Sequence, residues 1–521
     1  MILRPELVEL VIRRRDDHPD AQAVLFAGET VTWSQLSDRM WRAANALLGA
    51  GIVPGDRVAL CLGNSPDFLA VYLGLVAIGA APVPVNVAQR GPSLRHILEH
   101  SGTVAAVVEA GLDAAIRAAW PEHQLRIIRR GGPDFEPFRS GPVDEPGIDI
   151  GGRSPIGILY TSGTTGPPKG VVADGYDLRP AQLLVSLFGM AGGEVTYTCL
   201  PLFHGNALML SFMGAVRNDW VLALGERFSA SRFWDEIRST GAVSFTALGA
   251  MIPILLKAPP SRRDRDHAVR VVISAACPDW AWEQFEERFG VRLVEFFGMV
   301  DSPGLLINAE GRRGAMGRAV TGVDFRVVDE RDVDVADGEI GELVFAHPDG
   351  RLTHYHDDQQ STDQAYRGGW FHSGDLARRD ADGFFYYCGR QKESMRRRGE
   401  NISAWEIESV LNQHPDVLEC AAFGVVSELG EEEVAVAVVP IDGRGFDPSN
   451  VETWCDGQLA AYAIPRFVVI RHALPKTGTH RIQYGALKAE GLTGEVWDRA
   501  ATAKDSTPDV PPAEPQTRSE R

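Results

Sequence analysis

The sequence predicts an α/β fold, made of a large N-terminal domain with several layers and a small C-terminal α+β domain. Three observations predict it. Helical and strand-like patterns alternate through the first 390 residues, which is typical of buried, largely parallel strands covered by helices. The length of 521 residues exceeds one ordinary core, so more than one compact unit is expected. After about Gln391 the alternation gives way to one clear helix followed by neighbouring strand-like runs.

The elements of the large domain follow from their periodicity and their boundaries. Apolar residues spaced by three and four positions predict helices over residues 7–15, 33–51 and 67–80. Short apolar runs bounded by glycine, proline or charged residues predict buried strands over residues 58–63, 81–87, 104–110, 156–160, 271–276 and 291–297. From about Gly338 the chain is rich in glycine and aspartate, which indicates smaller β-structures.

Three segments are expected along the chain. The large domain is placed at residues 1–390, the small domain at residues 391–495 and a disordered tail at residues 496–521. Within the small domain, residues 403–415 have helical spacing, and strand-like runs are residues 420–426, 432–441 and 466–474. The tail is rich in alanine, threonine, proline and glutamate, and such a composition buries too little apolar surface to fold.

The composition excludes several classes of partner and site. Asp and Glu total 70 against 52 Lys and Arg, so the net charge of −18 repels both nucleic acid and anionic membranes. The 6 cysteines contain no Cys-x-x-Cys pair, which argues against a disulfide framework or structural zinc and for a reducing compartment. The N-terminal segment carries charges from Arg4 onward, unlike a signal peptide, and two prolines break the longest uncharged run, residues 70–89. We therefore expect a cytoplasmic protein.

The densest chemical signal lies in residues 156–172, IGILYTSGTTGPPKGVV. An apolar strand runs directly into hydroxyl and glycine residues and then a lysine. Glycines let the backbone approach an anion closely, hydroxyls donate hydrogen bonds and the lysine adds charge, so the segment is predicted to bind a polyphosphate. The lysine precedes a glycine, which a Walker A loop does not allow. The predicted phosphate-binding residues are Thr161, Ser162, Gly163, Thr164, Thr165, Gly166 and Lys169.

This loop resembles that of the AMP-forming adenylating enzymes, which comprise acyl-CoA synthetases, peptide-synthetase adenylation domains and beetle luciferases. Further segments resemble the family in the same order and at the same spacing, from about residue 10 to residue 490. They are residues 273–280 (ISAACPDW), 296–303 (FFGMVDSP), 369–390 (GWFHSGDLARRDADGFFYYCGR), 396–408 (RRRGENISAWEIE) and 474–483 (LPKTGTHRIQ). Three stretches are most similar to the carnitine- and crotonobetaine-CoA ligase branch: residues 200–207 (LPLFHGNA), 232–237 (RFWDEI) and 389–403.

The resemblance implies a two-step reaction. A carboxylate attacks the α-phosphorus of MgATP, pyrophosphate leaves and an acyl-adenylate forms; a thiol or an amine then displaces AMP. ATP and Mg²⁺ are therefore the implied cofactors, and a small-molecule acid and coenzyme A are the implied substrates. The small domain is implied to be mobile and to rotate about a hinge at Lys392 between the two half-reactions. The sequence carries no signal for an oligomeric state.

The resemblance also assigns nucleotide-binding roles. Ala276, Phe297 and Gly298 are implied to contact the nucleotide, with Phe297 stacked on adenine. Asp375 is implied to accept hydrogen bonds from both ribose hydroxyls, since one carboxylate can accept from both groups of a diol. The alternative is that Asp375 only caps a turn. Arg390 is implied to lie over the nucleotide.

The resemblance assigns further residues to the binding of the acid and of the thiol. His204, directly after LPLF, resembles the gate beside the acyl pocket, and a core histidine is the alternative. Gly399 opens a loop that is implied to face the thiol step, and the adjacent Arg398 offers charge to coenzyme A. The pocket candidates are all small and fit many shapes: Asn206, Ala247, Gly249, Ala250 and Gly304.

The sequence departs from the family at three positions. The family's adenylating lysine is Arg481 here, which replaces a compact ammonium by a planar fork. The glutamate that helps to hold magnesium is Asp301, one methylene shorter, and the threonine before it is Val300. Charge developing on the α-phosphoryl group needs closely placed donors, so these exchanges predict either a site retuned for a different acid or a partial loss of activity. A third reading is that Lys476 or Lys488 reaches the site.

The leading hypothesis is an AMP-forming carboxylate–CoA ligase with Arg481, Lys169 and His204 as catalytic residues. The runner-up is an adenylating enzyme with an amine acceptor, such as an ATP-dependent diazotase that activates nitrite and converts an aryl amine. A non-catalytic nucleotide-binding relative is the third hypothesis. Residues 354–358 (HYHDD) suggest a metal site, but their surroundings favour an exposed loop.

Overall fold

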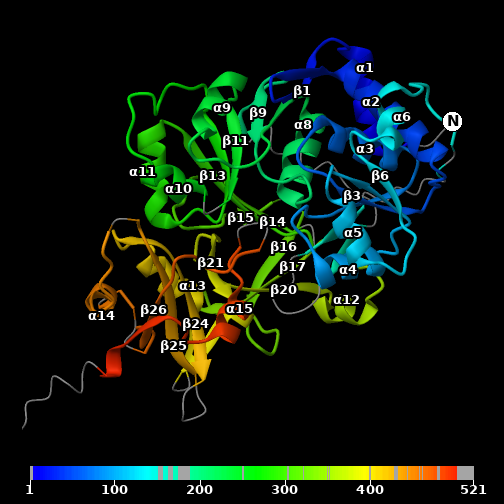
Figure 1. Cartoon of the computed structure of the whole chain (residues 1–521). Coiled ribbons are helices and arrows are strands. Elements are labelled where there is room, and N and C mark those ends of the chain that lie inside the picture. Colours follow the sequence, from blue (N-terminus) through cyan, green and yellow to red (C-terminus); the bar gives the residue numbers. More distant parts are fainter. Residues whose placement is uncertain are drawn as a thin grey trace, which may run out of the picture. The chain divides into compact units, whose positions relative to one another are not determined.

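The computed structural model of the chain divides into two units, Met1–Tyr387 and Cys388–Arg521 (Figure 1). It describes residues 4–148, 150, 157–161, 168–173, 188–248, 251–301, 304–320, 322–348, 350, 353–397, 400–426, 432–442, 444–456, 458–459, 462–477 and 481–501. No helix within these ranges has both the length and the apolar composition needed to cross a membrane.

A nine-stranded sheet of described residues runs through the larger unit in the order β15-β14-β13-β12-β11-β9-β10-β1-β2. The strands from β13 to β1 are parallel, whereas β2 at one end and β14 and β15 at the other pair antiparallel. The bounds are β1 (Gln22–Phe26), β2 (Glu29–Thr32), β9 (Val195–Thr198), β10 (Val221–Leu224), β11 (Ser244–Leu248), β12 (Val271–Ala275), β13 (Arg292–Gly298), β14 (Leu305–Asn308) and β15 (Arg318–Ala319). The helices α9 (Phe233–Thr240), α10 (Met251–Lys257) and α11 (Asp279–Phe289) pack against this sheet.

A second, fully parallel sheet of described residues has the order β4-β3-β5-β6. Its strands are β3 (Arg57–Cys61), β4 (Ala81–Pro84), β5 (Ala105–Val108) and β6 (Arg126–Arg129). Alternate residues of β3 face opposite cores, because Val58 and Leu60 pack toward the nine-stranded sheet and Ala59 and Cys61 pack away from it. The helices on the outer face are α4 (Gly91–His100) and α5 (Asp113–Ala119).

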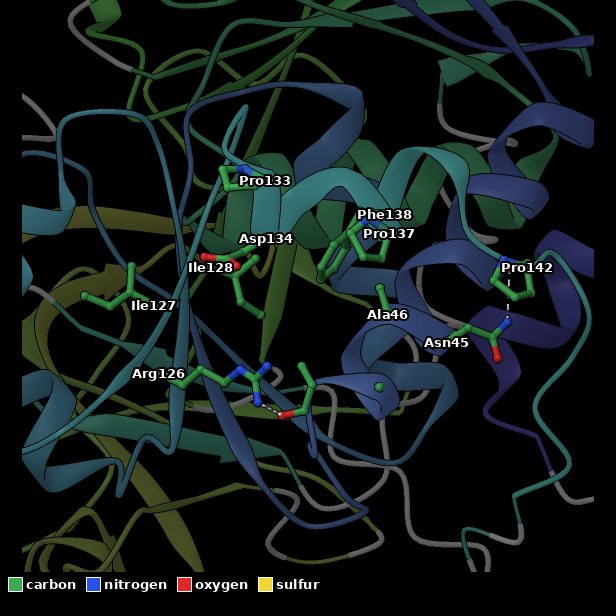
Figure 2. Close-up of a pocket in the computed structure, with 12 residues that line it drawn as sticks. Asn45, Ala46, Arg126, Ile127, Ile128, Pro133, Asp134, Pro137, Phe138 and Pro142 are labelled. Carbon is green, nitrogen blue, oxygen red and sulfur yellow. Dashed lines mark hydrogen bonds between the residues drawn. The ribbon is translucent and has the colours of Figure 1, made fainter.

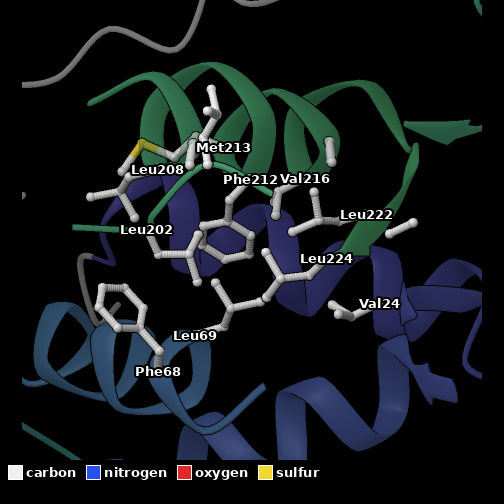
Figure 3. Close-up of a cluster of buried hydrophobic side chains, with 14 of the residues drawn as sticks. Val24, Phe68, Leu69, Leu202, Leu208, Phe212, Met213, Val216, Leu222 and Leu224 are labelled. Atoms are coloured by element: carbon white, nitrogen blue, oxygen red, sulfur yellow. The ribbon is translucent and has the colours of Figure 1, made fainter. Parts of the chain in front are cut away.

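Helices fill the layer between the two parallel sheets. They include α1 (Glu6–Asp17), α2 (Trp33–Gly49), α3 (Pro66–Ala77), the π-helix η2 (Asn206–Met213) and α8 (Gly214–Asn218), while η1 (Pro133–Phe135) and α6 (Glu136–Ser140) follow β6. Helix α3 is buried along most of its length, as expected for a helix between two sheets. Figure 3 shows Phe212 of η2 and Leu69 of α3 directed toward each other, next to Leu224 of β10. This core holds η2, which begins at the predicted site residue Asn206 and directly follows the loop with His204.

Two smaller antiparallel sheets complete the larger unit. One has the order β18-β8-β7 and consists of β7 (Ile158–Tyr160), β8 (Gly170–Ala173) and β18 (Thr353–Tyr355). The other has the order β16-β17-β20-β19, with β21 paired to β20. Its elements are β16 (Asp324–Val328), β17 (Ile340–Ala346), α12 (Gln359–Ala365), β19 (Tyr366–Arg367), β20 (Trp370–Arg379) and β21 (Phe385–Arg390).

The smaller unit is built on a sheet with the order β24-β25-β26-β27. Its elements are η3 (Gln391–Glu393), the hairpin β22 (Ser394–Arg397) and β23 (Glu400–Ser403), α13 (Ala404–Leu411), β24 (Val417–Val426), β25 (Glu432–Pro440), α14 (Asn450–Cys455), β26 (Phe467–Ile470), α15 (Tyr484–Glu490) and β27 (Glu495–Asp498). Alternate residues of β25 face two cores: Val436 packs with α13 and α14, and Ala437 packs with Leu487 of α15.

The predicted fold class is confirmed, and two expectations are corrected. The run at residues 156–160 becomes β7, which pairs antiparallel with β8 instead of joining a parallel sheet. The tail expected from residue 496 starts too early, because β27 (Glu495–Asp498) pairs with β26 and Asp498 forms an ion pair with Arg466. Residues 502–521 of that tail lie outside the described residues.

Candidate functional site

Most of the motifs in the larger unit follow neighbouring parallel strands. The loops after β9, β12 and β13 contain His204, Ala276 and Asp301, respectively. In an open α/β sheet the carboxyl ends of parallel strands lie at one edge, and ligands bind there. The topology therefore gathers segments that are up to about a hundred residues apart in the sequence at one edge of the nine-stranded sheet.

The loop that carries His204 is held by the side chain of Asn64, which directly precedes the N-cap residue of α3. Asn64 Nδ2 donates to the carbonyl oxygens of Leu200 at 3.0 Å and Gly225 at 2.9 Å, and Asn64 Oδ1 accepts from the Leu202 amide at 2.9 Å. The His204 amide donates to the Pro201 carbonyl at 3.0 Å, which tightens the turn before η2. His204 itself is half-buried.

The same loop lies directly against one of the positions that depart from the family. A Cβ atom added to Gly205 would lie 2.6 Å from Cγ2 of Val300, so only glycine allows this close approach. Residues 204–206 are thus in contact with the segment after β13, and Val300 supplies an apolar surface where a hydroxyl was expected. This contact joins the predicted acid-binding segment to the predicted α-phosphate segment.

The loop after β12 is held by a buried carboxyl group that the sequence analysis missed. Glu295 accepts hydrogen bonds from the amide of Ala276 and, at 3.1 Å, from the amide of Cys277. Ala276 has φ of 64°, a left-handed conformation that is strained for a residue with a side chain. Burial raises the pKa of Glu295 to about 8, despite the amide donors that lower it. Phe297 and Gly298 follow on the same strand, with Phe297 half-buried.

Lys169 and Asp301 are joined through Tyr355. The Lys169 ammonium nitrogen lies 4.6 Å from the centre of the Tyr355 ring, which is a cation–π contact. The Tyr355 hydroxyl donates to Asp301 Oδ1 at 3.2 Å, and burial together with this carboxylate raises the pKa of Tyr355. Tyr355 is opposite Val171 in the β18–β8 pair, and Val171 is on the same side of β8 as Lys169, so the sheet register brings the three together.

A second contact ties Asp301 to the sheet that carries Asp375. Thr353 Oγ1 lies 2.7 Å from the Tyr366 hydroxyl and also bonds to the Asp301 carbonyl oxygen. Tyr366 is in β19, which pairs with Phe371 of β20, and Asp375 follows on β20. The structure therefore connects the lysine, the two carboxylates and their strands within one unit.

Asp375 is 3% exposed and lies in an irregular part of β20. Its amide donates to Ser373 Oγ at 3.1 Å. The two residues before Asp375 are bonded to β17, where the strand register shifts. A buried aspartate at such a bulge is suited to present its carboxylate to a ligand.

Both ends of the predicted phosphate loop are held by α4. His96 Nε2 donates to the Pro168 carbonyl at 2.9 Å, directly before Lys169, and His100 Nδ1 lies 2.8 Å from the Tyr160 hydroxyl before Thr161. Burial lowers the pKa of His100. The Thr161 amide donates to the Lys169 carbonyl at 2.9 Å and closes the loop. The members between them, Ser162, Gly163, Thr164, Thr165 and Gly166, lie outside the described residues.

The predicted acid-pocket residues separate into three groups. Asn206 Oδ1 is buried and has no hydrogen-bond partner among the described residues, as expected of an atom that faces a ligand. Ala247 is fully buried in the large core, and a Cβ on Gly304 would lie 2.4 Å from the Phe345 ring, so neither offers open surface. Gly249 and Ala250 lie outside the described residues.

The remaining site residues belong to the smaller unit. Arg390 ends β21, and Lys392 lies in the short helix η3 that follows. The Arg481 amide donates to Thr477 Oγ1 at 3.2 Å, and the Thr477 amide donates to the Arg481 carbonyl at 2.8 Å, which forms a tight turn. Arg398 and Gly399 lie outside the described residues.

The two lysines considered as substitutes for Arg481 have partners elsewhere. Lys476 Nζ lies 2.5 Å from Glu419 Oε2, and Lys488 Nζ lies 3.4 Å from Glu432 Oε1. Ion pairs at this degree of exposure are weak, so either lysine could leave its partner to take the place of Arg481 at only a small energetic cost.

Asp301 is the carboxylate that the sequence predicts for a magnesium ion. Among the described residues, no group of three or more His, Cys, Asp or Glu side chains is placed to hold a metal. Magnesium needs no such cage, because it is commonly bound by one or two carboxylates together with substrate phosphates. A single carboxylate next to Lys169 fits that donor set. The residues of HYHDD form part of β18 and the turn after it.

A shallow pocket of about 430 Å³ lies in another part of the larger unit, between the end of α2, β6 and α6 (Figure 2). Two of its polar side chains are bound to the backbone: Arg126 donates to the Ala50 carbonyl at 2.5 Å, and Asn45 donates to the Pro142 carbonyl at 3.1 Å. None of the predicted site residues that the structure describes lines it.

Comparison with known families decides the assignment. The sequence profile of the AMP-binding enzyme family matches residues 12–355, and that of the AMP-binding enzyme C-terminal domain matches residues 406–481. The chain belongs to the AMP-binding enzyme family. Residues 356–405 fall between the two matches, and they include β20, which carries Asp375, and the predicted hinge Lys392.

Single proteins resemble this AMP-binding enzyme over most of its length. The crotonobetaine/carnitine–CoA ligase of Salmonella agona (strain SL483) is 29% identical over 475 residues, which cover 87% of this chain and 92% of that protein. The structure of ATP-bound MatB from Rhodopseudomonas palustris is 26% identical, with a TM-score of 0.84 over 92% of this chain and 98% of that one. The anthranilate CoA ligase AuaEII, in complex with anthranoyl-AMP, shares the fold with a TM-score of 0.86 over 96% and 99% of the two chains at 23% identity. The AMP-binding enzyme is thus an AMP-forming ligase.

Proposed function

We propose that this AMP-binding enzyme is a carboxylate–CoA ligase that activates a small acid with MgATP and transfers the acyl group to coenzyme A. The observation that carries the proposal is the assembly of Lys169, Tyr355 and Asp301, in which a cation and a carboxylate contact the same tyrosine at the end of the predicted phosphate loop. The relatives named as CoA ligases favour this function over an amine-accepting or non-catalytic one.

Lys169 and Asp301 have different roles toward the negative triphosphate, one direct and one through a metal ion. Lys169 leaves the Tyr355 ring for the phosphates, because a charge-assisted bond to phosphate is stronger than a cation–π contact. Asp301 would hold Mg²⁺, and the ion would neutralise charge on the phosphate oxygens. Pyrophosphate is then the leaving group that these residues bind.

The nucleoside is bound by the other loops of the larger unit. The loop held by Glu295 presents Ala276 to adenine, and Phe297 stacks on the base. Asp375 accepts from the ribose hydroxyls; its burial makes each bond to a charged acceptor worth about 1.5–3 kcal/mol. His204 and the buried Asn206 Oδ1 face the acid.

The end of the predicted large domain and the predicted small domain supply the groups that change between the two steps. Arg481 stabilises the charge that develops during adenylation, Arg390 lies over the nucleotide, and Lys392 is the hinge between domains of residues 1–390 and 391–495. After rotation, Gly399 and Arg398 face coenzyme A. The dispersed, reduced cysteines support a cytoplasmic location.

The proposal is tested by ATP–pyrophosphate exchange across a panel of small carboxylic acids and nitrite, each with and without coenzyme A. We expect exchange with one class of carboxylic acid, and a loss of at least about 10²-fold in Lys169→Ala, because one preorganised donor is worth that much. Tyr462→Phe, in the smaller unit and outside the assembly, is the control. Exchange with nitrite alone, or unchanged exchange in Lys169→Ala, would contradict the proposal.

A further inference from the structure

We infer that Glu342 is a positioning residue for the nucleotide: it clamps the bulge of β20 that carries Asp375 and so determines how tightly the ribose hydroxyls are bound. The inference rests on the proposed function, because it takes Asp375 as the group that contacts the ribose. It concerns a side chain of β17 that contacts no nucleotide itself.

The bulge is defined by the strand register. Glu342 is opposite Leu376 and Val344 is opposite His372, so Leu343 alone faces the three residues 373–375. Extra residues on one strand are left without ladder partners and need other hydrogen bonds. Ser373 supplies two of these, since its hydroxyl donates to the Leu343 carbonyl at 2.5 Å and accepts from the Asp375 amide at 3.1 Å.

Glu342 supplies the contact in the middle of the bulge. Its Oε1 accepts from the Gly374 amide at 3.1 Å. Gly374 has φ of 69°, which a residue with a side chain adopts only at a cost, so this amide has a fixed and unusual direction. Because Gly374 directly precedes Asp375, the carboxylate of Glu342 fixes the backbone from which the Asp375 side chain projects.

The second oxygen of Glu342 is held by two donors. Glu342 Oε2 accepts from His372 Nδ1 at 2.9 Å and from Arg367 Nη2 at 3.2 Å. The Glu342 side chain is 10% exposed and that of His372 is 5% exposed, so water does not replace these bonds. Arg367 also reaches Asp332 at 3.4 Å and connects the clamp to the surface. Both carboxylate oxygens of Glu342 thus have partners: Oε1 bonds to the bulge, and Oε2 bonds to the side chains of His372 and Arg367.

The substitution Glu342→Gln tests whether the hydrogen bonds of Glu342, and not only the packing of its side chain, hold the bulge. Glutamine keeps the size of the side chain and one oxygen for Gly374, but its amino group faces the donors His372 and Arg367. The side chain therefore has to turn or shift, and the Gly374 contact weakens. The exposed Glu339→Gln, three residues earlier, is the matched control, because its carboxylate accepts only from the Ala336 amide at 3.2 Å among the described residues.

The experiment measures dissociation constants by calorimetry for ATP and for 2′,3′-dideoxy-ATP, together with thermal midpoints. In the native protein the ratio of the two constants is expected to be at least about tenfold, since two bonds to a charged acceptor are lost with the hydroxyls. Glu342→Gln is expected to lower this ratio at least about threefold, by weakening ATP and leaving the dideoxy nucleotide unchanged. Asp375→Ala is expected to bring the ratio near one, and adding Glu342→Gln to it should change nothing further.

Three results overturn the inference in distinguishable ways. If Glu342→Gln weakens both nucleotides equally or keeps the native ratio, while Asp375→Ala lowers it, Glu342 is only structural and the proposed function stands. If Asp375→Ala keeps the native ratio, the ribose assignment in the proposed function is wrong and the inference falls with it. If Glu342→Gln does not fold, the more exposed Arg367→Gln replaces it. The ratio of the two dissociation constants is then expected to be about twofold lower than in the native protein. An unchanged ratio would contradict the role of Glu342 as a clamp.

Discussion

The hydroxyl of Tyr355 donates a hydrogen bond to Asp301 Oδ1 at 3.2 Å. The same ring lies 4.6 Å from the Lys169 ammonium nitrogen, so one side chain contacts both charged groups of the predicted triphosphate site. Tyr355 therefore sets the distance between the cation and the carboxylate before any ligand binds.

Tyr355→Phe tests this relationship. The phenylalanine ring keeps the cation–π contact with Lys169 and removes only the bond to Asp301, which is worth roughly a factor of three to ten. We expect the magnesium concentration for half-maximal ATP–pyrophosphate exchange to rise by about that factor. Tyr386→Phe, which removes a similar bond to the surface carboxylate of Asp380, is the control. An unchanged magnesium dependence would show that the hydroxyl does not orient Asp301.

Arg481 is tested by two substitutions. Arg481→Ala should lower the adenylation rate by about 10²–10³, the usual loss for one preorganised donor. Arg481→Lys distinguishes two cases. If the exchange of lysine for arginine is incidental, the lysine variant should match or exceed the native adenylation rate. If Arg481 is matched to the shorter Asp301, the lysine variant should have a lower rate. Native activity in Arg481→Ala would refute both, and Lys476 would then be examined first, after release from Glu419.

Lys392→Pro tests the hinge. Proline fixes φ near −65° and prevents the backbone rotation that the second half-reaction requires. Pyrophosphate exchange should survive while acyl-CoA formation falls, both measured on the same preparation with Gln391→Ala as the control. A parallel loss of both steps would move the pivot away from Lys392.

The smaller unit should lose stability as the pH rises. Burial raises the pKa of Glu408 to about 8, although the Ala422 amide and the Tyr484 hydroxyl, both at 2.8 Å, partly oppose the shift. A carboxyl whose pKa is raised by folding stabilises the fold most below its unfolded pKa of about 4.5 and loses that contribution as the pH rises through about 8. Hydrogen exchange of the β24 amides, corrected for intrinsic rates, should show falling stability between pH 5 and about 8.5. Glu408→Gln, which cannot ionise, should flatten the profile; parallel profiles for the two proteins would contradict the assignment.

Periodicity and motif spacing predicted the parallel strands and most of the segments at the sheet edge, because both are local properties of the chain. The supporting contacts were not predictable in the same way. Glu342 and His372 are 30 residues apart, His96 and Pro168 are 72 apart, and only the strand order and the place of α4 bring them together. The role of Tyr355 was not predicted, because the polar run HYHDD is typical of a loop. Its one signal, the alternation of Thr353 and Tyr355 on one face of a strand, is weak over three residues.

In the proposed reaction a carboxylate oxygen attacks the α-phosphorus of ATP. The most direct test uses the acid identified by pyrophosphate exchange, labelled with ¹⁸O in its carboxyl group, and mass spectrometry of the nucleotide product. We predict AMP that carries one ¹⁸O atom for each acyl-CoA formed. Unlabelled AMP, or ADP with the label in inorganic phosphate, would contradict the account.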